Sequence, residues 1–176
     1  MSKNLKKSWR KVTVISILIL LILIIISGVI FYSLFFNSSY NGRGNGKVLE
    51  NPAKGLSLKE AIEKFDESFV IYLLVNIGAY NLHPPIFGSD TPKIEFRIGD
   101  DVYNAEIVNG RIGVGRGEID VEDIIIWTNK NEAVKMVMDK DYIDDSFISG
   151  ESSIELVAGK IELASKGYLQ IYSQLS

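Results

Sequence analysis

Cysteine is absent from the 176 residues of this chain, and histidine occurs once, at His83. Without cysteine the chain has no disulfide scaffold, thiol nucleophile or thiolate metal site. A Ser-His-Asp arrangement needs a base beside its nucleophile, and a zinc site needs several converging ligands. His83 stands between Leu82 and Pro84, which indicates a surface or loop-packing role. We therefore expect no enzymatic activity, no catalytic residue, no resident metal and no cofactor.

Acidic residues are missing from the first 36 positions, so the net charge of −3 describes no single part of the chain. Residues 1–11 carry five basic groups, and residues 12–36 carry no charge. The remaining 140 residues hold 14 basic and 22 acidic groups, a net charge of −8. Because phosphate contacts need a basic surface, this acidic part is not expected to bind nucleic acid.

An uncharged apolar run covers residues 12–36. As a helix rising about 1.5 Å per residue it would be roughly 37 Å long, enough for a hydrocarbon core of about 30 Å. A cleaved signal peptide has a shorter apolar region followed by small residues, whereas bulky Leu34, Phe35 and Phe36 end this run. We predict a retained signal-anchor helix over 12–36 whose partner is the lipid bilayer. The basic tail 1–11 then stays in the cytoplasm, and the C-terminal domain lies outside the cell membrane.

Residues 37–54 connect this span to the rest of the chain and contain Asn-Gly and Arg-Gly pairs. Such a stretch is flexible and has too few apolar groups to join a core. We interpret it as a linker that tethers an extracytoplasmic domain, residues 55–176.

The domain begins with a predicted helix. Ser57 and Glu60 have the spacing of a capping box, and apolar residues then recur at helical spacing as far as Leu73. From Phe69 to Val75 the segment is apolar on all sides, so we expect its second half to be enclosed. It is too short to be a second membrane span.

A β-rich section follows the helix. Apolar residues alternate with polar ones over 94–98 and 103–107, and Asn109-Gly110 supplies the positive φ angles of a type I′ hairpin. A third strand is predicted at 111–114 and a fourth at 124–127, whose continuous apolar run indicates that both of its faces are covered. These strands predict an antiparallel meander with one packed face.

The last third of the chain has weaker patterns. We predict a short helix at 129–138, helical pieces within 141–158, a fifth strand at 160–164 and a closing helix at 168–175. The fold class is therefore α+β, with an N-terminal transmembrane helix followed by a mostly antiparallel sheet of about five strands packed with helices.

Two clusters contain residue types that occur in ligand sites. The glycine-rich stretch 113–117 is followed by acidic residues instead of the helix that a phosphate site needs, which favours a flexible strand end with a bulge. Four acidic residues within 139–145 lack the spacing and turn glycine of a calcium-binding loop, which favours a solvated helix start.

The order of these elements resembles the sterol carrier protein-2 (SCP2) family. The residues that carry the likeness are 94–100, 103–110, 123–128 with the helix after them, and 159–163 with Lys166-Gly167. The layout is also similar to membrane-tethered archaeal proteins with this kind of outer domain. The chain departs from the family in its predicted anchor, in a longer segment at 139–158 and in lacking a Ser-Lys-Leu end. The resemblance implies a cavity between sheet and helices for a lipid or other apolar ligand.

Binding of such a ligand is the function we expect, with five side chains lining the cavity: Phe65, Phe69, Leu73, Phe96 and Trp127. Ordinary core packing is the alternative for each of them. The alternative function is a protein–protein interaction or structural module of the cell envelope without a small-molecule ligand.

Overall fold

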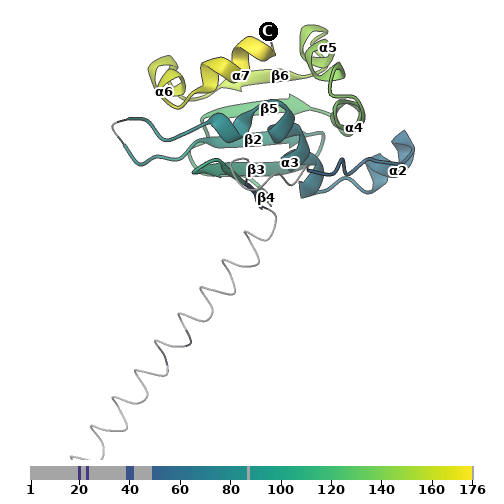
Figure 1. Cartoon of the computed structure of the whole chain (residues 1–176), viewed down its shortest axis with the longest axis horizontal. Helices are drawn as coiled ribbons and strands as arrows, with labels where there is room; N and C mark the ends of the chain where they lie inside the picture. Colours follow the sequence, from purple (N-terminus) through teal and green to yellow (C-terminus); the bar gives the residue numbers. More distant parts are fainter. Residues whose placement is uncertain (1–19, 21–22, 24–38, 42–48, 87, 176) are drawn as a thin grey trace, which may run out of the picture. The chain divides into compact units, whose positions relative to one another are not determined.

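The computed structural model describes residues 20, 23, 39–41, 49–86 and 88–175 (Figure 1). The chain divides into two units, Met1–Asn37 and Ser38–Ser176. The predicted tail 1–11 and the predicted span 12–36 lie outside the described residues, except for Leu20 and Leu23, which are helical. Within the described part of the chain, no helix has the length and apolar character needed to cross a membrane.

The second unit is built around one mixed sheet with the strand order β1-β4-β3-β2-β5-β6. Its strands are β1 (Ser39–Asn41), β2 (Lys93–Ile98), β3 (Asp101–Val108), β4 (Arg111–Arg116), β5 (Ile124–Thr128) and β6 (Ser153–Leu156). Strands β2 and β5 pair in parallel, and the other neighbours pair antiparallel. The predicted mostly antiparallel sheet is confirmed, and the predicted meander holds for β2, β3 and β4. Its fourth strand is wrong, because β5 does not follow β4 in the sheet but pairs in parallel with β2.

The turn chemistry of the meander follows the sequence. Asn109 and Gly110 between β3 and β4 have φ angles of 54° and 76°, which is the backbone that a two-residue type I′ turn requires. The register places Tyr103, Ala105 and Ile107 on one face of β3, and all three are buried. A shift by one residue would expose them, so this turn fixes which face enters the core.

The helices are α2 (Leu58–Glu63), α3 (Glu67–Asn76), the 3₁₀ helix η1 (Ala79–Asn81), α4 (Lys130–Met138), α5 (Tyr142–Ile148), α6 (Lys160–Ser165) and α7 (Tyr168–Gln174). The capping box of Ser57 and Glu60 is confirmed. The single helix predicted after it is wrong, because Asp66 interrupts it. The Asp66 carboxylate accepts a hydrogen bond from the Ser68 backbone N–H and starts α3 as a new helix.

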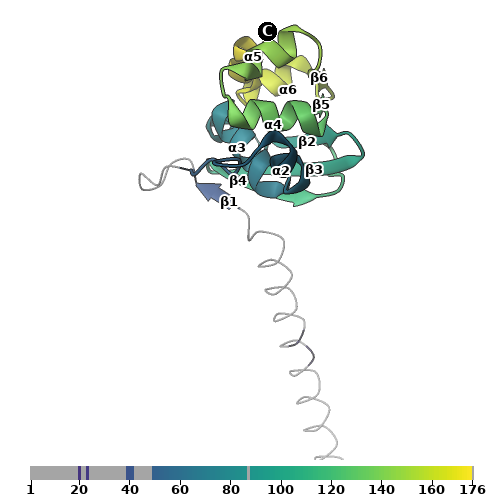
Figure 2. The same ribbon diagram turned by 90° about the vertical axis from the view of Figure 1, so that its right-hand side faces the viewer.

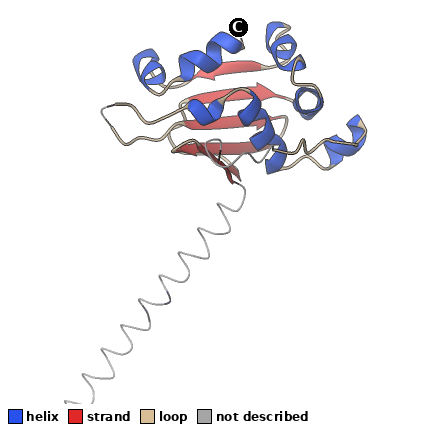
Figure 3. Ribbon diagram, viewed as in Figure 1, coloured by secondary structure: helices blue, strands red, loops and turns tan. Residues whose placement is uncertain are grey.

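The helices gather on one face of the sheet (Figures 1, 2 and 3), so the unit has two layers. Between the layers lies a continuous core that includes Leu74 of α3, Ile94 and Phe96 of β2, and Ile126 of β5. On the opposite face of β5, Ile125 is buried whereas Trp127 is 40% exposed. The prediction that both faces of this strand are covered is therefore correct for Ile125 and wrong for Trp127.

The strand predicted at 160–164 is wrong, because these residues form α6. Ile161 and Leu163 would share one face of a strand, whereas Ile161 is exposed and Leu163 is buried, because residues two positions apart lie on opposite sides of a helix. The edge strand beside β5 is instead β6. It lies within the segment 141–158, for which we predicted helical pieces. The helical part of that expectation holds for α5.

Part of the predicted linker 37–54 is structured. Three of its residues form β1, which pairs with the edge of β4 in the register Tyr40 to Ile112. Near its other end, the Asn51 side-chain amide donates a hydrogen bond to the Val137 carbonyl over 2.7 Å, and Ala53 is buried. A polar, glycine-containing stretch thus supplies an edge strand because the backbone of β4 offers hydrogen-bonding partners whatever the side chains are.

Candidate ligand-binding cavity

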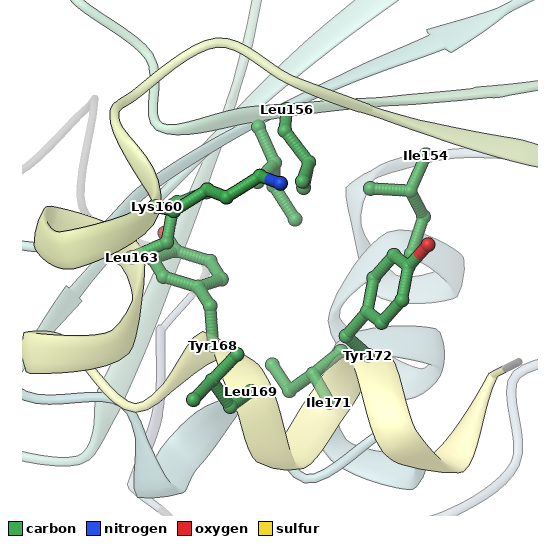
Figure 4. A pocket seen from close by; sticks show the side chains of 9 residues that line it. Ile154, Leu156, Lys160, Leu163, Tyr168, Leu169, Ile171 and Tyr172 are labelled. Atoms are coloured by element: carbon green, nitrogen blue, oxygen red, sulfur yellow. The ribbon is translucent and has the colours of Figure 1, made fainter.

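A cavity of about 230 Å³ lies between strand β6 and helices α6 and α7 (Figure 4). An apolar hollow of about 150 Å³ is enough to hold benzene, and sites for drug-sized ligands start near 300 Å³. The cavity therefore has room for a small apolar group or one short acyl chain. Every side chain of its lining except Lys160 is apolar or aromatic: Ile124, Ile154, Leu156, Lys160, Leu163, Tyr168, Leu169, Ile171 and Tyr172.

The cavity has a buried floor and an exposed rim. Leu163, Tyr168 and Ile171 are buried on the core side, whereas Leu169 and Tyr172 of α7 are 63% and 48% exposed. Figure 4 shows the side chains arranged around an open centre, with the Lys160 amine directed toward Leu156. The part of an apolar group that reaches the buried floor would lose its water, which is the main source of affinity for such groups.

Gly167 creates the shape of the wall by joining α6 to α7. Its φ angle of 91° lies in the left-handed region, which glycine adopts without strain. A Cβ at this position would meet no atom closer than 3.7 Å, so backbone conformation and not space requires glycine. The turn lets two short helices leave the sheet edge with Leu163 and Ile171 both facing inward.

A charged cluster supports the floor of the cavity, with Lys166 and Asp123 buried and Asp90 and Glu162 about half exposed. The Lys166 amine lies 2.6 Å from Asp123 Oδ1, 2.5 Å from Asp90 Oδ2 and 3.0 Å from Glu162 Oε1. The Tyr168 hydroxyl, at the tip of a ring that lines the cavity, donates to Asp123 Oδ2 over 2.9 Å. This Lys166 cluster links the loop before β2, the start of β5 and both helices of the wall.

The pKa shifts in the cluster have clear causes. The hydrogen bond from Lys166 holds the pKa of Asp90 below its ordinary value of 3.8. Burial alone would lower the pKa of Lys166, but the hydrogen bonds to its three carboxylates outweigh it and raise this pKa. Burial raises the pKa of Tyr168, and the charge of Asp123 adds to the rise. Lys166 is therefore charged and Tyr168 neutral at neutral pH.

The carboxylates of this cluster resemble a cation site in geometry. One oxygen from each of Asp90, Asp123 and Glu162 lies within 4.8 Å of the others. Hard metal ions favour such oxygen ligands. Here the Lys166 amine lies within 3.0 Å of an oxygen from each carboxylate, so an ammonium group takes the position that a metal ion would need.

The predicted ligand residues Phe65 and Phe69 lie in a different part of the core. Their ring centroids are 5.0 Å apart, and Phe65 also meets the Tyr103 ring edge-on at 5.9 Å. Both side chains are buried, and neither lines the cavity beside β6. They occupy the core-packing role that was the alternative for each predicted residue.

The remaining predicted residues are also dispersed. Leu73 and Phe96 line a void of about 10 Å³ between α3, α4 and the sheet, which is the size of a single water molecule. Trp127 lies on the helix-free face, where its indole N–H donates to Glu155 over 3.0 Å and the Arg97 guanidinium covers its ring at 5.1 Å. The structure thus brings Leu73 and Phe96 together and separates them from Trp127. Ligand contact by these five residues stays a prediction.

Sequence reasoning missed the residues that line the larger cavity, although part of the signal was present. Tyr168, Ile171 and Tyr172 fall on one face of the closing helix, which indicates a partner surface for that helix. The other wall is β6, which lies in a segment whose sequence pattern predicts helical pieces. A sheet edge opposite an apolar helix is the pattern that would have located the cavity.

No protein-family model matches this chain, and no curated protein matches its sequence. Solved structures do match. The crystal structure of Sterol Carrier Protein 2 Like 2 from Aedes aegypti is 12% identical, with a TM-score of 0.36, over 62% of this chain and 95% of that one. The solution NMR structure of palmitated SCP2L2 from Aedes aegypti is 16% identical, with a TM-score of 0.36, over 60% and 93%.

A third match is a UbiJ-SCP2 ubiquinone synthesis protein, 11% identical with a TM-score of 0.36, over 72% of this chain and 98% of that one. All three matched structures carry SCP2 in their titles, the family whose strand and turn pattern this sequence resembles. The predicted α+β class of this domain is confirmed by its own six-stranded sheet and helices.

Proposed function

We propose that residues 38–176 form a binding domain for a small apolar ligand, held in the cavity between β6 and α7. The observation that carries this proposal is the lining. Of the nine residues that form it, Lys160 alone has a charged side chain. Water in a hollow with this lining finds few hydrogen-bonding partners, so the hollow favours an apolar group.

The single amine at the rim selects among apolar ligands. A carboxylate on the end of an acyl chain would meet the Lys160 ammonium while the chain occupies the buried floor. Lys160 is exposed, so a carboxylate is attracted at the rim with little desolvation, whereas an amine head group would be repelled. The cavity as formed takes one short chain or the end of a longer one, because its volume of about 230 Å³ is below that of ordinary drug-sized sites.

Octanoate is expected to bind up to about fivefold more tightly than octylamine, since an ion pair at an exposed rim contributes at most about 1 kcal/mol. Methyl NMR of residues 38–176 measures this directly, with shifts expected at Leu163 and Ile171. In the matched variant Lys160→Gln the preference should disappear while octanol binding is retained. Absence of shifts at both methyl groups with every ligand would rule out the cavity as a binding site.

We further propose that residues 12–36 anchor this domain to the cell membrane, with the N-terminus in the cytoplasm and the domain outside. The support is the uncharged run of 25 residues and the five basic groups before it. Because the chain has no cysteine, a single Asp144→Cys variant reports the location of the domain. Intact cells should be labelled by a membrane-impermeant maleimide, with Ser2→Cys as the control that stays protected. Labelling of Asp144→Cys only after lysis would contradict this topology.

The exposed indole of Trp127 favours a second candidate function, binding of another protein to the helix-free face. Trp is over-represented at the centre of protein interfaces, and this one is 40% exposed and covered by Arg97. Methyl shifts confined to the cavity in the octanoate titration would favour ligand binding. If octanoate shifts no methyl group of the cavity, protein binding through the helix-free face is the better-supported function.

A further inference from the structure

The cavity beside β6 has a small neighbour on the core face of the sheet. On β5, Ile124 lines the cavity, whereas Ile126 lines the void of about 10 Å³ that Leu73 and Phe96 also line; we call this the inner void. Residues two positions apart on a strand face the same side and lie about 7 Å from each other. Ile126 also pairs with Ile154 of β6, which lines the cavity. The two hollows are therefore neighbours along β5 and across the β5–β6 pair.

Two isoleucines of the helical layer border these hollows. Ile171 of α7 lines the cavity, Ile77 at the end of α3 lines the inner void, and both also line a third hollow of about 10 Å³. Gly78 and Gly167 form part of the wall of that third hollow and carry no side chain that could fill it. Each isoleucine thus borders empty space on two sides, which is uncommon in an interior packed as densely as an organic crystal.

We propose that Ile171 and Ile77 form a movable partition, and that a longer acyl chain displaces both side chains to reach the inner void. The cavity and the inner void would then hold one continuous chain that ends against Leu73 and Phe96. This inference rests on the ligand binding proposed above and extends its ligand class to carboxylates whose acyl chains are longer than the cavity alone can hold. Two of the five predicted ligand residues would thereby contact the far end of the chain.

The partition can open without forcing the core apart. Rotation about χ2 moves the terminal methyl group of an isoleucine between staggered positions without changing χ1, which the branched Cβ restricts. The third hollow can receive such a methyl group, and few contacts are lost on the sides that already face empty space. Every side chain of the inner void is apolar or aromatic, so water would find no hydrogen-bonding partner there. Met136, which lines the inner void, is unbranched and can adapt its shape to the end of the chain.

Intermolecular NOEs from the terminal methyl group of the ligand test the proposal. Residues 38–176 are suitable, because the sheet and the core described above lie entirely within them. The terminal methyl group of octanoate should contact Leu163 and not Met136, whereas that of tetradecanoate should contact Met136. Octanoate contacts at Leu163 with no tetradecanoate contact at Met136 would overturn the partition and leave the proposed function intact. No contact at Leu163 with either ligand would remove the proposed function and this inference with it.

Two variants at Ile77 show whether the chain passes this residue. Ile77→Val removes one methyl group, so the ratio of tetradecanoate to octanoate affinity, measured by calorimetry, should rise about fourfold, the value of one buried methylene. Ile107→Val is the matched control and should leave this ratio unchanged, because Ile107 is fully buried on β3 and lines neither the cavity nor the inner void.

The larger side chain of Ile77→Phe should close the passage between the two hollows. We expect it to abolish the tetradecanoate contact at Met136, while octanoate still contacts Leu163 and thereby shows that the variant is folded. A tetradecanoate contact at Met136 that persists in Ile77→Phe would overturn the proposal. An affinity ratio that stays the same in Ile77→Val would overturn it as well.

Discussion

Replacing Lys166 with methionine is expected to lower the free energy of unfolding by about 3–5 kcal/mol, the cost of breaking a buried ion pair by removing one partner. The side chains of Lys166 and Asp123 are 1% and 3% exposed, and their charged atoms lie 2.6 Å apart. Methionine keeps much of the lysine volume but removes the ammonium. The Asp123 carboxylate would then keep the Tyr168 hydroxyl and the Lys93 backbone N–H but lose its buried counter-charge.

Urea unfolding of residues 38–176 measures this loss, and Lys54→Met is the matched control. Lys54 forms an ion pair with Glu50 over 3.3 Å, but both side chains are about three-quarters exposed, at 74% and 78%. Exposed pairs of this kind contribute about 0.2–1 kcal/mol, so the same substitution should have a much smaller effect there. Equal losses at the two positions would show that the Lys166 cluster is not a stabilising element.

The effect of Lys166→Met should also depend on pH in a defined way. Asp90 has a lowered pKa, so its contribution is present above its unfolded value of 3.8 and is lost as the pH falls through the lower folded value. Lys166 has a raised pKa, so its contribution is complete below 10.5 and is lost as the pH rises through the higher folded value. The difference between the two proteins should therefore be largest between these limits. A difference that stays constant below pH 3.8 would contradict the assignment.

The features of the fold that were predictable are those decided by neighbouring residues. The capping box of Ser57 and Glu60 and the positive φ angles of Asn109-Gly110 depend on two to four adjacent positions. The alternation in β2 and β3 extends over enough residues to distinguish a strand from a helix. For these elements the local preference and the tertiary structure agree.

The features that were missed depend on contacts between distant segments. Strand β6 has four residues and acquires its identity by pairing Ile154 with Ile126 of β5. The parallel pairing of β2 with β5 follows from the path of the chain after β4, where the Ile119 N–H donates to the buried Glu95 carboxylate. Neither partner is visible in the local sequence. Tertiary contacts decide whether a short segment with mixed propensities becomes a strand or a helix. A local sequence pattern does not include these contacts.

The candidate site was less predictable than the fold for a related reason. The five predicted residues were chosen for size and apolarity, and these properties also define the best core side chains. Phe69 and Phe96 are each 2% exposed, so they fill space instead of enclosing it. A cavity forms where side chains fail to fill a space, here between Ile154 of β6 and Ile171 of α7. Whether two distant segments leave such a gap is decided by packing and not by residue type.

Replacing Leu163 with tryptophan is expected to weaken octanoate binding by about tenfold or more while changing the free energy of unfolding by less than about 1 kcal/mol. Leu163 is buried and its side chain lines the cavity. The additional atoms of the indole would enter the hollow of about 230 Å³ that the ligand otherwise occupies. Filling an existing void adds favourable contacts instead of forcing neighbours apart.

The same substitution at Leu74 is the control, because Leu74 is fully buried in α3 and lines neither the cavity nor the void near Phe96. Overpacking a filled core costs about 1–3 kcal/mol, so Leu74→Trp should be clearly less stable than Leu163→Trp. Calorimetric or urea unfolding gives the two stabilities, and the octanoate titration gives the binding. If both variants are destabilised alike, the space beside α7 is closed in solution. The combination of retained stability and lost binding requires a hollow that the ligand and the indole compete to fill.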